Sequence, residues 1–384
     1  MTDVSPFASF FMAGFECSSQ RRRDGVRLDL IKATGHDTHA LADYRRCADL
    51  GIRSIRDGLR WHLIGRDRLR RDWDCWLPML DAAEEAGVEV LWDLYHYGSP
   101  DYLKAGTRDF EKAFADYAAE AVALHRERTG KPAMVCPVNE ISFFAWAVET
   151  GYFPPVEVEQ GNIKQHLARC WIAAVDAIRS VDPEVRFIGA EPLIHVAPHD
   201  HSEAKMRDAE NYRQAQFEAY DMLTGRAQPE LGGRPDAIDF IGLNFYPHNQ
   251  WYYNGPTIPM GHHEYRALAD MLVEVADRYG KPIFIAETGA EGSGRPAWLH
   301  YVCAEARSAM ERGAPIKGIC LYPVTAYPGG DNSRHADVGL FSTILSDGSR
   351  SLNVSLYEEL QRQRELFGLQ PTTFQQQQRG QAGR

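Results

Sequence analysis

Apolar and polar positions follow one order that repeats along most of the chain. An amphipathic helix is followed by a glycine, a short apolar run and then a polar loop. Residues 110–129, for example, have the spacing of an amphipathic helix and are followed by Gly130, just before the apolar run at 135–140. A glycine just past a helix supplies the left-handed residue that ends it. The pattern predicts further helices at residues 41–50, 76–86, 262–279, 298–312 and 354–366.

The apolar runs are predicted to be strands of one barrel. Short apolar runs between polar loops are typical of parallel strands buried on both faces. Eight such strands are predicted, at residues 10–15, 52–56, 88–92, 135–140, 185–191, 237–244, 282–287 and 316–322. Eight strands alternating with helices indicate an α/β protein with a (β/α)8 TIM barrel. An open doubly wound sheet is the alternative, but no Gly-x-Gly-x-x-Gly turn follows an early strand to support it.

The composition is that of one globular domain with a short tail. The 384 residues are 44% apolar and 25% charged, which is typical of a globular protein with a large buried core. No break in composition suggests a second domain, so residues 1–370 are assigned to a single barrel domain. Residues 371–384 include four consecutive glutamines, and this low-complexity segment is predicted to be a disordered carboxyl-terminal tail.

Charge and cysteine spacing exclude several classes of function. The net charge of −11 argues against a nucleic-acid partner, because a phosphate-binding surface needs clustered cations. The seven cysteines show no C-x-x-C spacing, so neither a metal centre nor another cofactor is predicted. No segment has the apolar length of a membrane span, and the first residues do not resemble a secretion signal. We therefore expect a cytoplasmic protein, and the sequence makes no prediction of its oligomeric state.

Two glutamates close apolar runs in matching positions. Glu140 ends the run at 135–140, and Glu287 ends the run at 282–287. A carboxylate at the end of a barrel strand lies at the edge where such barrels carry their chemistry. Cleavage of a glycosidic bond needs two carboxylates: one donates a proton to the leaving oxygen, and the other attacks the anomeric carbon or activates water. Each glutamate alone could instead form a structural ion pair with an arginine, but the matching contexts of the two favour catalysis.

Six segments resemble, in order and on matching strands, those of glycoside hydrolase family 1, the β-glucosidase and β-galactosidase family. They lie at residues 56–61, 94–97, 139–140, 151–155, 239–246 and 285–290. The chain is shorter than is usual for that family. The resemblance implies a retaining β-glycosidase that acts on a carbohydrate through a covalent glycosyl-enzyme. Hydrolysis and transfer to another acceptor both remain open.

The resemblance also implies roles for residues around the two glutamates. Glu287 would be the nucleophile, and Glu140 the general acid that later serves as base. Arg56 and Tyr246 would contact Glu287 and keep it ionised. This agrees with the chemistry, because a neighbouring arginine lowers the pKa of a carboxylate. The acid must stay protonated, which favours a poorly solvated position near a negative charge.

Four further residues are placed in the sugar-binding site by the same resemblance. Asn139 would hydrogen-bond the 2-hydroxyl of the sugar, and His96 would hold another hydroxyl of the glycone. Asn244 lies in the sixth-strand segment, and Tyr322 stands where the family has a tryptophan on the eighth strand. The sequence predicts no particular sugar, linkage or aglycone.

The sugar-binding part departs from the family pattern in several places. After the first strand the family has a glutamine that grips the glycone, and here either Glu16 or Gln20 is available. Residues 327–335 lack the Glu-Trp pair that usually binds the outer hydroxyls. Residues 247–260 are predicted to be a long loop, whose aromatic side chains either stack on sugar rings or pack the loop onto the barrel.

These departures keep two other functions open. The first is a catalytically silent carbohydrate-binding barrel that retains the fold and the pocket. The second is a metal-dependent hydrolase, because His195, His199 and His201 follow Glu191 at the end of a predicted strand. The amidohydrolase pattern would also need an early His-x-His on the first strand, which this sequence lacks, so a polar loop at the rim is the favoured interpretation.

Overall fold

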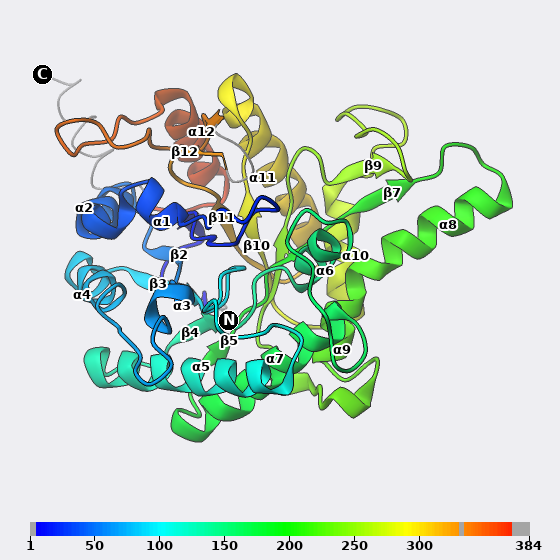
Figure 1. The fold of residues 1–384 in the computed structure, drawn as a ribbon. Helices are drawn as coiled ribbons and strands as arrows, with labels where there is room; N and C mark the ends of the chain where they lie inside the picture. Colours follow the sequence, from blue (N-terminus) through cyan, green and yellow to red (C-terminus); the bar gives the residue numbers. More distant parts are fainter. Residues whose placement is uncertain (1–4, 330–333, 371–384) are drawn as a thin grey trace, which may run out of the picture.

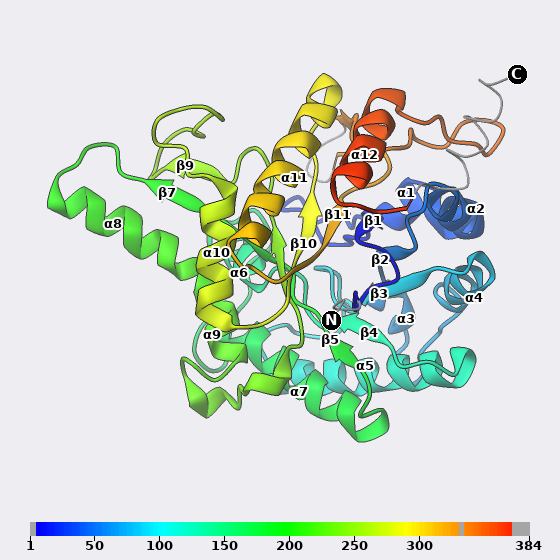
Figure 2. The same ribbon diagram turned by 180° about the vertical axis from the view of Figure 1, so that it is seen from behind.

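Parallel strands form a central barrel, and helices surround it (Figures 1 and 2). The computed structural model describes residues 5–329 and 334–370, so the predicted tail at 371–384 lies outside the described residues. The strands pair in the order β5-β4-β3-β2-β1-β11-β10-β8-β6. Their bounds are β1 Phe11–Gly14, β2 Ser54–Gly58, β3 Glu89–Asp93, β4 Met134–Cys136, β5 Arg186–Phe187, β6 Glu191–Pro192, β8 Ile241–Asn244, β10 Ile283–Thr288 and β11 Ile316–Leu321.

The first and last strands of this order close the barrel. β5 and β6 are consecutive pieces of one extended segment, residues 186–192, so the sheet begins and ends on the same stretch of chain. Between them Ile188 forms a parallel bridge with Phe240, and the Gly189 N–H donates to the Phe240 carbonyl oxygen at 2.9 Å. The barrel therefore has eight strand positions, and the predicted (β/α)8 fold is confirmed.

The helices cover the outside of the barrel, and each of the six predicted helices is present. The long helices are α2 His36–Asp49, α4 Leu77–Ala86, α5 Arg108–Thr129, α7 Ile163–Val181, α10 Leu268–Tyr279, α11 Arg295–Glu311 and α12 Val354–Leu366. Shorter helices are α1 Leu30–Ala33, α3 Trp61–Ile64, α6 Ile141–Glu149 and α9 Glu218–Leu223. The predicted helix at 354–366 has the observed bounds of α12. The helix predicted at 262–279 begins six residues later, at Leu268.

Glycines end two of these helices as the pattern predicted. Gly130 follows α5 with φ of 70°, and Gly280 follows α10 with φ of 62°. Both values lie in the left-handed region, which glycine enters without the clash that a Cβ atom would cause. The chain can then turn directly into the next strand, as it does from α10 into β10.

An arm made of β7 His195–Ala197, α8 Glu203–Gln214 and β9 Gln250–Tyr252 projects from one side of the barrel in both views (Figures 1 and 2). β7 and β9 pair in parallel as a separate two-stranded sheet. The prediction of a loop over 247–260 is wrong at β9, because this segment finds its partner more than fifty residues earlier in the chain. The Gln250 side chain also fixes it, donating to the Arg266 carbonyl oxygen at 2.9 Å.

The strands of the barrel carry many buried apolar side chains, and the buried charged and amide residues gather near one end. Ile55, Leu91, Ile285 and Ile319 are fully buried on four of the strands. Buried charged and amide side chains stand instead near the carboxyl ends of the strands, where this fold carries its chemistry. No helix in the described part of the chain is long and apolar enough to cross a membrane.

Candidate active site

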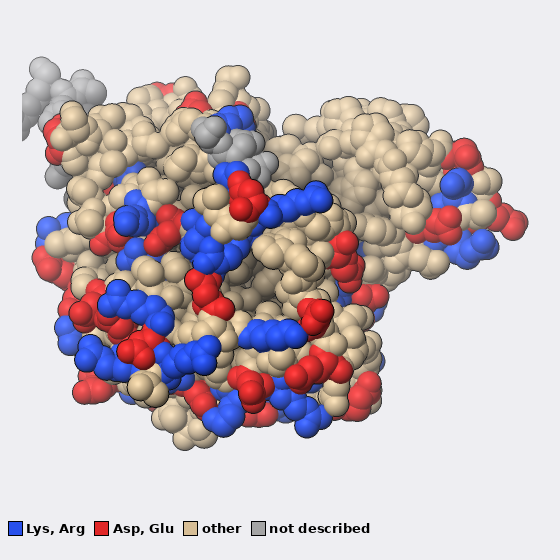
Figure 3. Space-filling model, viewed as in Figure 1, with Lys and Arg blue, Asp and Glu red and all other residues tan. Residues whose placement is uncertain are grey.

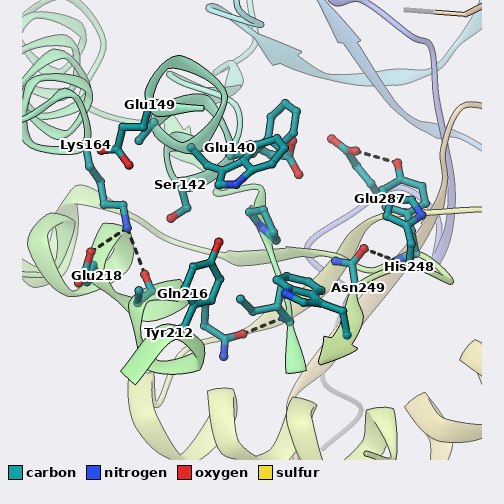
Figure 4. A pocket seen from close by; sticks show the side chains of 18 of the residues that line it. Glu140, Ser142, Glu149, Lys164, Tyr212, Gln216, Glu218, His248, Asn249 and Glu287 are labelled. Atoms are coloured by element: carbon teal, nitrogen blue, oxygen red, sulfur yellow. Dashed lines mark hydrogen bonds and ion pairs between the residues drawn. The ribbon is translucent and has the colours of Figure 1, made fainter. Parts of the chain in front are cut away.

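A cavity of about 780 Å³ opens at the carboxyl end of the strands and is bordered by both glutamates. Figure 4 shows Glu140 and Glu287 on its wall, with Lys164 and Glu218 at a distance along it. On the outside, the centre of the face in Figure 3 is hollowed, and the adjoining arm carries its charged side chains mainly at the outer end of α8. The cavity thus connects the end of the barrel with the inner side of the arm.

Glu287 is held on β10 by an arginine and a tyrosine. Arg56 Nη1 donates to Glu287 Oε1 at 2.9 Å, and the Tyr246 hydroxyl donates to Oε2 at 2.8 Å. The glutamate is only 5% exposed. Burial raises the pKa of Glu287, and the Arg56 charge opposes that rise. Both oxygens are therefore oriented, and a cation stands beside the carboxylate.

Arg56 lies on β2 and is fully buried. Besides Glu287, it donates from Nη2 to Asp93 Oδ2 at 2.6 Å and to Asn139 Oδ1 at 3.1 Å. Asp93 ends β3, next to β2 in the sheet, so parallel pairing brings the two together. Burial of an arginine is tolerated only with such partners. The arginine therefore has a fixed position under Glu287.

Glu140 follows β4 and stands at the start of α6. The Glu140 N–H donates to the Ala190 carbonyl oxygen at 2.8 Å, so the segment remains tied to the neighbouring strand beyond the end of β4. Its φ of 46° is left-handed, which is unusual for a residue with a side chain. This turn carries the chain from the barrel into α6 and directs the glutamate toward the cavity.

Both carboxylate oxygens of Glu140 accept hydrogen bonds. The Tyr97 hydroxyl donates to Oε2 at 2.5 Å, and Asn244 Nδ2 donates to Oε1 at 2.8 Å. These bonds favour the ionised form, but burial and then the charge of Glu287 raise the pKa of Glu140 to about 8. A carboxyl group with this pKa is mostly protonated near neutral pH. The surroundings of Glu287 differ, because the Arg56 guanidinium beside it favours the ionised form.

Asn139 and His96 are buried polar residues that lie beside these carboxylates. Asn139 Nδ2 donates to His96 Nε2 at 3.0 Å, and His96 Nδ1 lies 3.1 Å from Asp93 Oδ2. Burial alone would lower the pKa of His96, but the hydrogen bond and charge of Asp93 raise it. The Tyr322 ring lies parallel to the His96 ring at 6.5 Å between centroids. A buried, ordered set of polar groups thus lies on one side of the glutamates.

The two candidates after the first strand have different surroundings. Glu16 is half-buried, and its charge contributes to the raised pKa values of Glu287 and Tyr246, after burial and nearer partners. Gln20 is 8% exposed, and its side-chain Oε1 has no hydrogen-bond partner among the described residues. The Glu16 charge is therefore felt at Glu287, whereas Gln20 has a buried amide oxygen without a described partner, and both residues stay candidates.

Most of the predicted site residues are joined by direct contacts. Hydrogen bonds link Glu140, Glu287, Asn139, His96, Arg56, Asn244 and Tyr246 into one group. Sequence reasoning missed Tyr97 and Asp93. Asp93 directly follows the apolar run at 88–92, the same signal that identified Glu287. Tyr97 lies in a quoted segment, but its contact with Glu140 depends on tertiary structure.

The histidines after Glu191 do not form a cluster. His195 lies in β7, His199 stacks on Tyr252 at 5.3 Å, and His201 stands near Glu264. In the described part of the chain, one group of three side chains has the spacing of metal ligands, namely Cys17, Asp93 and His96. It fits a cation poorly, because Arg56 already occupies Asp93 Oδ2.

The fold is a TIM barrel, and it resembles those of solved family 1 β-glucosidases. A family 1 β-glucosidase from Thermotoga maritima superposes with a TM-score of 0.72 at 16% identity, covering 91% of this chain and 96% of that chain. The virulence factor SghA from Agrobacterium tumefaciens gives a TM-score of 0.72 at 16% identity over 92% of this chain and 96% of its own. A rice β-glucosidase mutant in a covalent complex with Glc gives 0.72 at 16% identity, with coverages of 92% and 98%. At such identity the likeness shows the fold.

Comparison of sequences reveals a weaker similarity than comparison of structures. No protein-family model matches the chain. A protein from Niallia circulans, described as an uncharacterized protein in the bgaB 5′ region, is 27% identical over 217 residues. The match covers 53% of this chain and about half, 49%, of that relative. The fold of family 1 β-glucosidases is thus present in a chain whose sequence is remote from theirs.

Proposed function

We propose that this protein is a retaining β-glycosidase that acts through a covalent glycosyl-enzyme, with Glu287 as nucleophile and Glu140 as acid and base. One observation carries the proposal: a buried carboxylate, Glu287, and a partly buried one, Glu140, border one cavity, and their environments differ in the way the reaction needs. Glu287 has the Arg56 cation at 2.9 Å, and Glu140 has a pKa raised to about 8 by burial and the neighbouring charge. Paired carboxylates with separated pKa values divide acid and nucleophile roles.

The first step would use both groups at once. Glu287 attacks the anomeric carbon, the glycosidic bond breaks, and the Glu140 proton goes to the leaving oxygen. Glu287 then carries the sugar as an ester and no longer has a charge. In the second step Glu140 takes a proton from water, whose oxygen bonds to the anomeric carbon as the ester bond to Glu287 breaks. A sugar hydroxyl in place of water gives transfer.

The neighbouring residues would hold the sugar. Asn139 and His96 are buried, hydrogen-bonded to each other and fixed in place beside Glu287 through Arg56. We assign Asn139 to the 2-hydroxyl, where a hydrogen bond strengthens as the transition state develops. His96, Tyr322 and Glu16 line the rest of the glycone side, and Asn244 orients Glu140. The cytoplasmic location and the single-domain assignment remain predictions.

A panel of nitrophenyl β-glycosides, including uronides and deoxy sugars, tests the proposal. Glu287→Ala and Glu140→Ala should each reduce turnover by at least about 10³-fold, in line with losses at catalytic groups of this kind. Azide should rescue Glu287→Ala and give a glycosyl azide of inverted configuration. A 2-fluoro glycoside should label Glu287 in the wild-type protein. Glu85→Ala, which removes an exposed carboxylate paired with Arg45, should leave turnover unchanged.

Full activity in either glutamate variant would falsify this assignment. Measurable oligosaccharide binding without labelling of Glu287 by any member of the panel would support the silent carbohydrate-binding barrel instead. Loss of activity to a chelator and its recovery with zinc would support the metal-dependent hydrolase.

A further inference from the structure

One chain of hydrogen bonds connects the two glutamates through the protein. Arg56 donates from Nη1 to Glu287 Oε1 at 2.9 Å and from Nη2 to Asn139 Oδ1 at 3.1 Å. Asn139 Nδ2 donates to the Tyr97 hydroxyl oxygen at 3.1 Å. The Tyr97 hydroxyl in turn donates to Glu140 Oε2 at 2.5 Å. Tyr97 is therefore the last residue in this series of hydrogen bonds, and it donates directly to Glu140.

Tyr97 is held in an unfavourable backbone conformation to make this contact. Its φ is 69°, in the left-handed region that residues with side chains seldom adopt. The ring packs against Phe144 and Phe153 at 5.5 and 5.4 Å between centroids, and the residue is 9% exposed. Such a conformation persists only where the surroundings determine it. The packing thus aims the hydroxyl at Glu140.

The direction of the hydrogen bonds determines what Tyr97 can do. Its hydroxyl oxygen already accepts from Asn139, so its single proton is available for Glu140. A donor at 2.5 Å stabilises the carboxylate and not the carboxylic acid. Burial and the Glu287 charge act in the opposite direction, toward the protonated form. Two opposing influences therefore meet on Glu140.

We propose that Tyr97 is a positioning residue that stabilises the ionised, base form of Glu140, so that the second step of the reaction can proceed. This inference rests on the proposed function. In the first step the Glu140 proton goes to the leaving oxygen, and the carboxylate that forms accepts the Tyr97 hydroxyl. Once Glu287 is glycosylated its charge is gone, and hydrogen bonds from Tyr97 and Asn244 keep Glu140 ionised until it takes a proton from water.

Titration of Glu140 tests the proposal without any substrate. Carboxyl ¹³C chemical shifts of glutamate-labelled protein follow the titration, and Glu140→Gln assigns the signal. Tyr97→Phe keeps the ring and removes the donor, so the pKa of Glu140 should rise by about one unit, the size expected for a lost hydrogen bond to a charge. Tyr95→Phe is the matched control: Tyr95 packs on the same Phe144 ring at 5.6 Å, and Glu140 is absent from its electrostatic partners.

A second substitution should shift the pKa of Glu140 in the opposite direction, and it provides a test if Tyr97→Phe misfolds. Replacing Tyr97 with 3-fluorotyrosine makes the hydroxyl a stronger donor and should lower the pKa of Glu140. If Tyr97→Phe fails to fold, the Glu140 titration of the 3-fluorotyrosine variant tests the proposal on its own. An unchanged Glu140 titration in either folded variant overturns the proposal, whether or not the protein turns over any glycoside.

Kinetics supply the link to the reaction. With an active substrate, Tyr97→Phe should slow the second step more than the first. The values of kcat and KM should then fall together, by several-fold, while kcat/KM changes less, and the glycosyl-enzyme should accumulate. A fall in kcat/KM with no fall in KM would instead indicate a structural role in the first step. Absence of turnover in the wild-type protein contradicts the proposed function but leaves the titration result in force.

Discussion

Arg56 and Asp93 form a fully buried ion pair at 2.6 Å, and neither side chain has any exposed surface. The same guanidinium holds Glu287, so Asp93 balances a positive charge that lies beside the Glu287 carboxylate. Burial alone would raise the pKa of Asp93, but Arg56 and His96 lower it. The pair therefore links the stability of the barrel to the electrostatics of the candidate site.

Asp93→Asn should destabilise the protein strongly. Removing one partner of a buried pair leaves the other charge uncompensated, which costs about 3–5 kcal/mol. Urea unfolding of wild type and variant measures the change. Asp81→Asn is the control, because Asp81 pairs with Arg128 at the surface, where a pair contributes only about 0–1 kcal/mol. Equal effects of the two substitutions would contradict the importance of the buried pair.

Glu191→Gln should remove a dependence of stability on pH. Glu191 is 3% exposed, and burial raises its pKa to about 7. A carboxyl group whose pKa is raised in the folded state favours folding while protonated, so stability falls as the pH rises from its unfolded pKa, near 4.5, through 7. The loss is on the order of 3 kcal/mol at 1.36 kcal/mol per pKa unit.

The Glu191 variant is compared with wild type by urea unfolding at pH 4.5 and pH 8. The difference in unfolding free energy between the two proteins should shift in favour of Glu191→Gln at the higher pH. The Ser142 N–H, which donates to Glu191 Oε2 at 3.0 Å, keeps an acceptor in the glutamine side chain. Parallel pH profiles of the two proteins would show that Glu191 does not titrate in this range.

His36 should stabilise the protein below pH 9. Its ring bonds Asp43 at 2.9 Å and Asp57 at 2.8 Å and stacks on Phe15 at 3.8 Å. Burial alone would lower the pKa of His36, but the two aspartates raise it to about 9. The stabilisation is complete below the unfolded pKa, near 6.5, and is lost as the pH rises through 9.

The expected size of the His36 effect is on the order of 3 kcal/mol between pH 6 and pH 10, from 1.36 kcal/mol per pKa unit. His36→Gln should lose stability at pH 6 and show a flatter profile above it. His39→Gln serves as control, because His39 is only part-buried and bonds the Gly35 carbonyl oxygen and the neighbouring Thr38. A wild-type profile that stays level between pH 6 and pH 10 would rule out a buried imidazolium.

Much of the fold could be predicted because its signals are local. Each strand is a short apolar run, and glycines such as Gly130 mark the helix ends within a few residues. Glu287 could be predicted for the same reason, because it closes the apolar run that forms β10. α12 matched its predicted bounds because a capping asparagine, Asn353, and an amphipathic pattern coincide there.

The remaining features depend on contacts between distant segments. β9 exists because residues 250–252 meet residues 195–197, and the apolar–polar pattern of either segment alone does not reveal that pairing. Tyr97 was overlooked because its role requires a left-handed backbone and a partner forty-three residues away. The different surroundings of Glu16 and Gln20 likewise depend on how the first loop turns, which the local pattern does not reveal.

Activity should decline as the pH rises through about 8. Glu140 must be protonated to act on the leaving oxygen, and burial together with Glu287 raises its pKa to about 8. The alkaline limb of kcat/KM for an alkyl or sugar leaving group should therefore reflect this pKa. A dinitrophenyl glycoside needs little protonation, so its alkaline limb should be weaker. Identical limbs for both leaving groups would remove Glu140 from the role of acid.

Anionic sugars should be poor substrates, and Glu16→Gln should improve them. The Glu16 charge helps to raise the pKa of Glu287, so Glu16 adds a negative charge near the proposed glycone site, and the fully buried Arg56 already pairs with Glu287 and Asp93. A uronide would thus bring a carboxylate toward a carboxylate. At an effective dielectric constant near 20, neighbouring like charges cost enough to lower kcat/KM by at least roughly tenfold.

The ratio of kcat/KM for a β-glycoside to that for the matching β-uronide measures this preference. Glu16→Gln should bring the ratio toward one, by raising the rate for the uronide while the neutral glycoside loses only a hydrogen-bond acceptor. Gln20→Leu is the comparison, because Gln20 has no described contact with either glutamate and should leave the ratio unchanged. If the uronide is preferred in the wild type, a cation other than Arg56 must face the sugar.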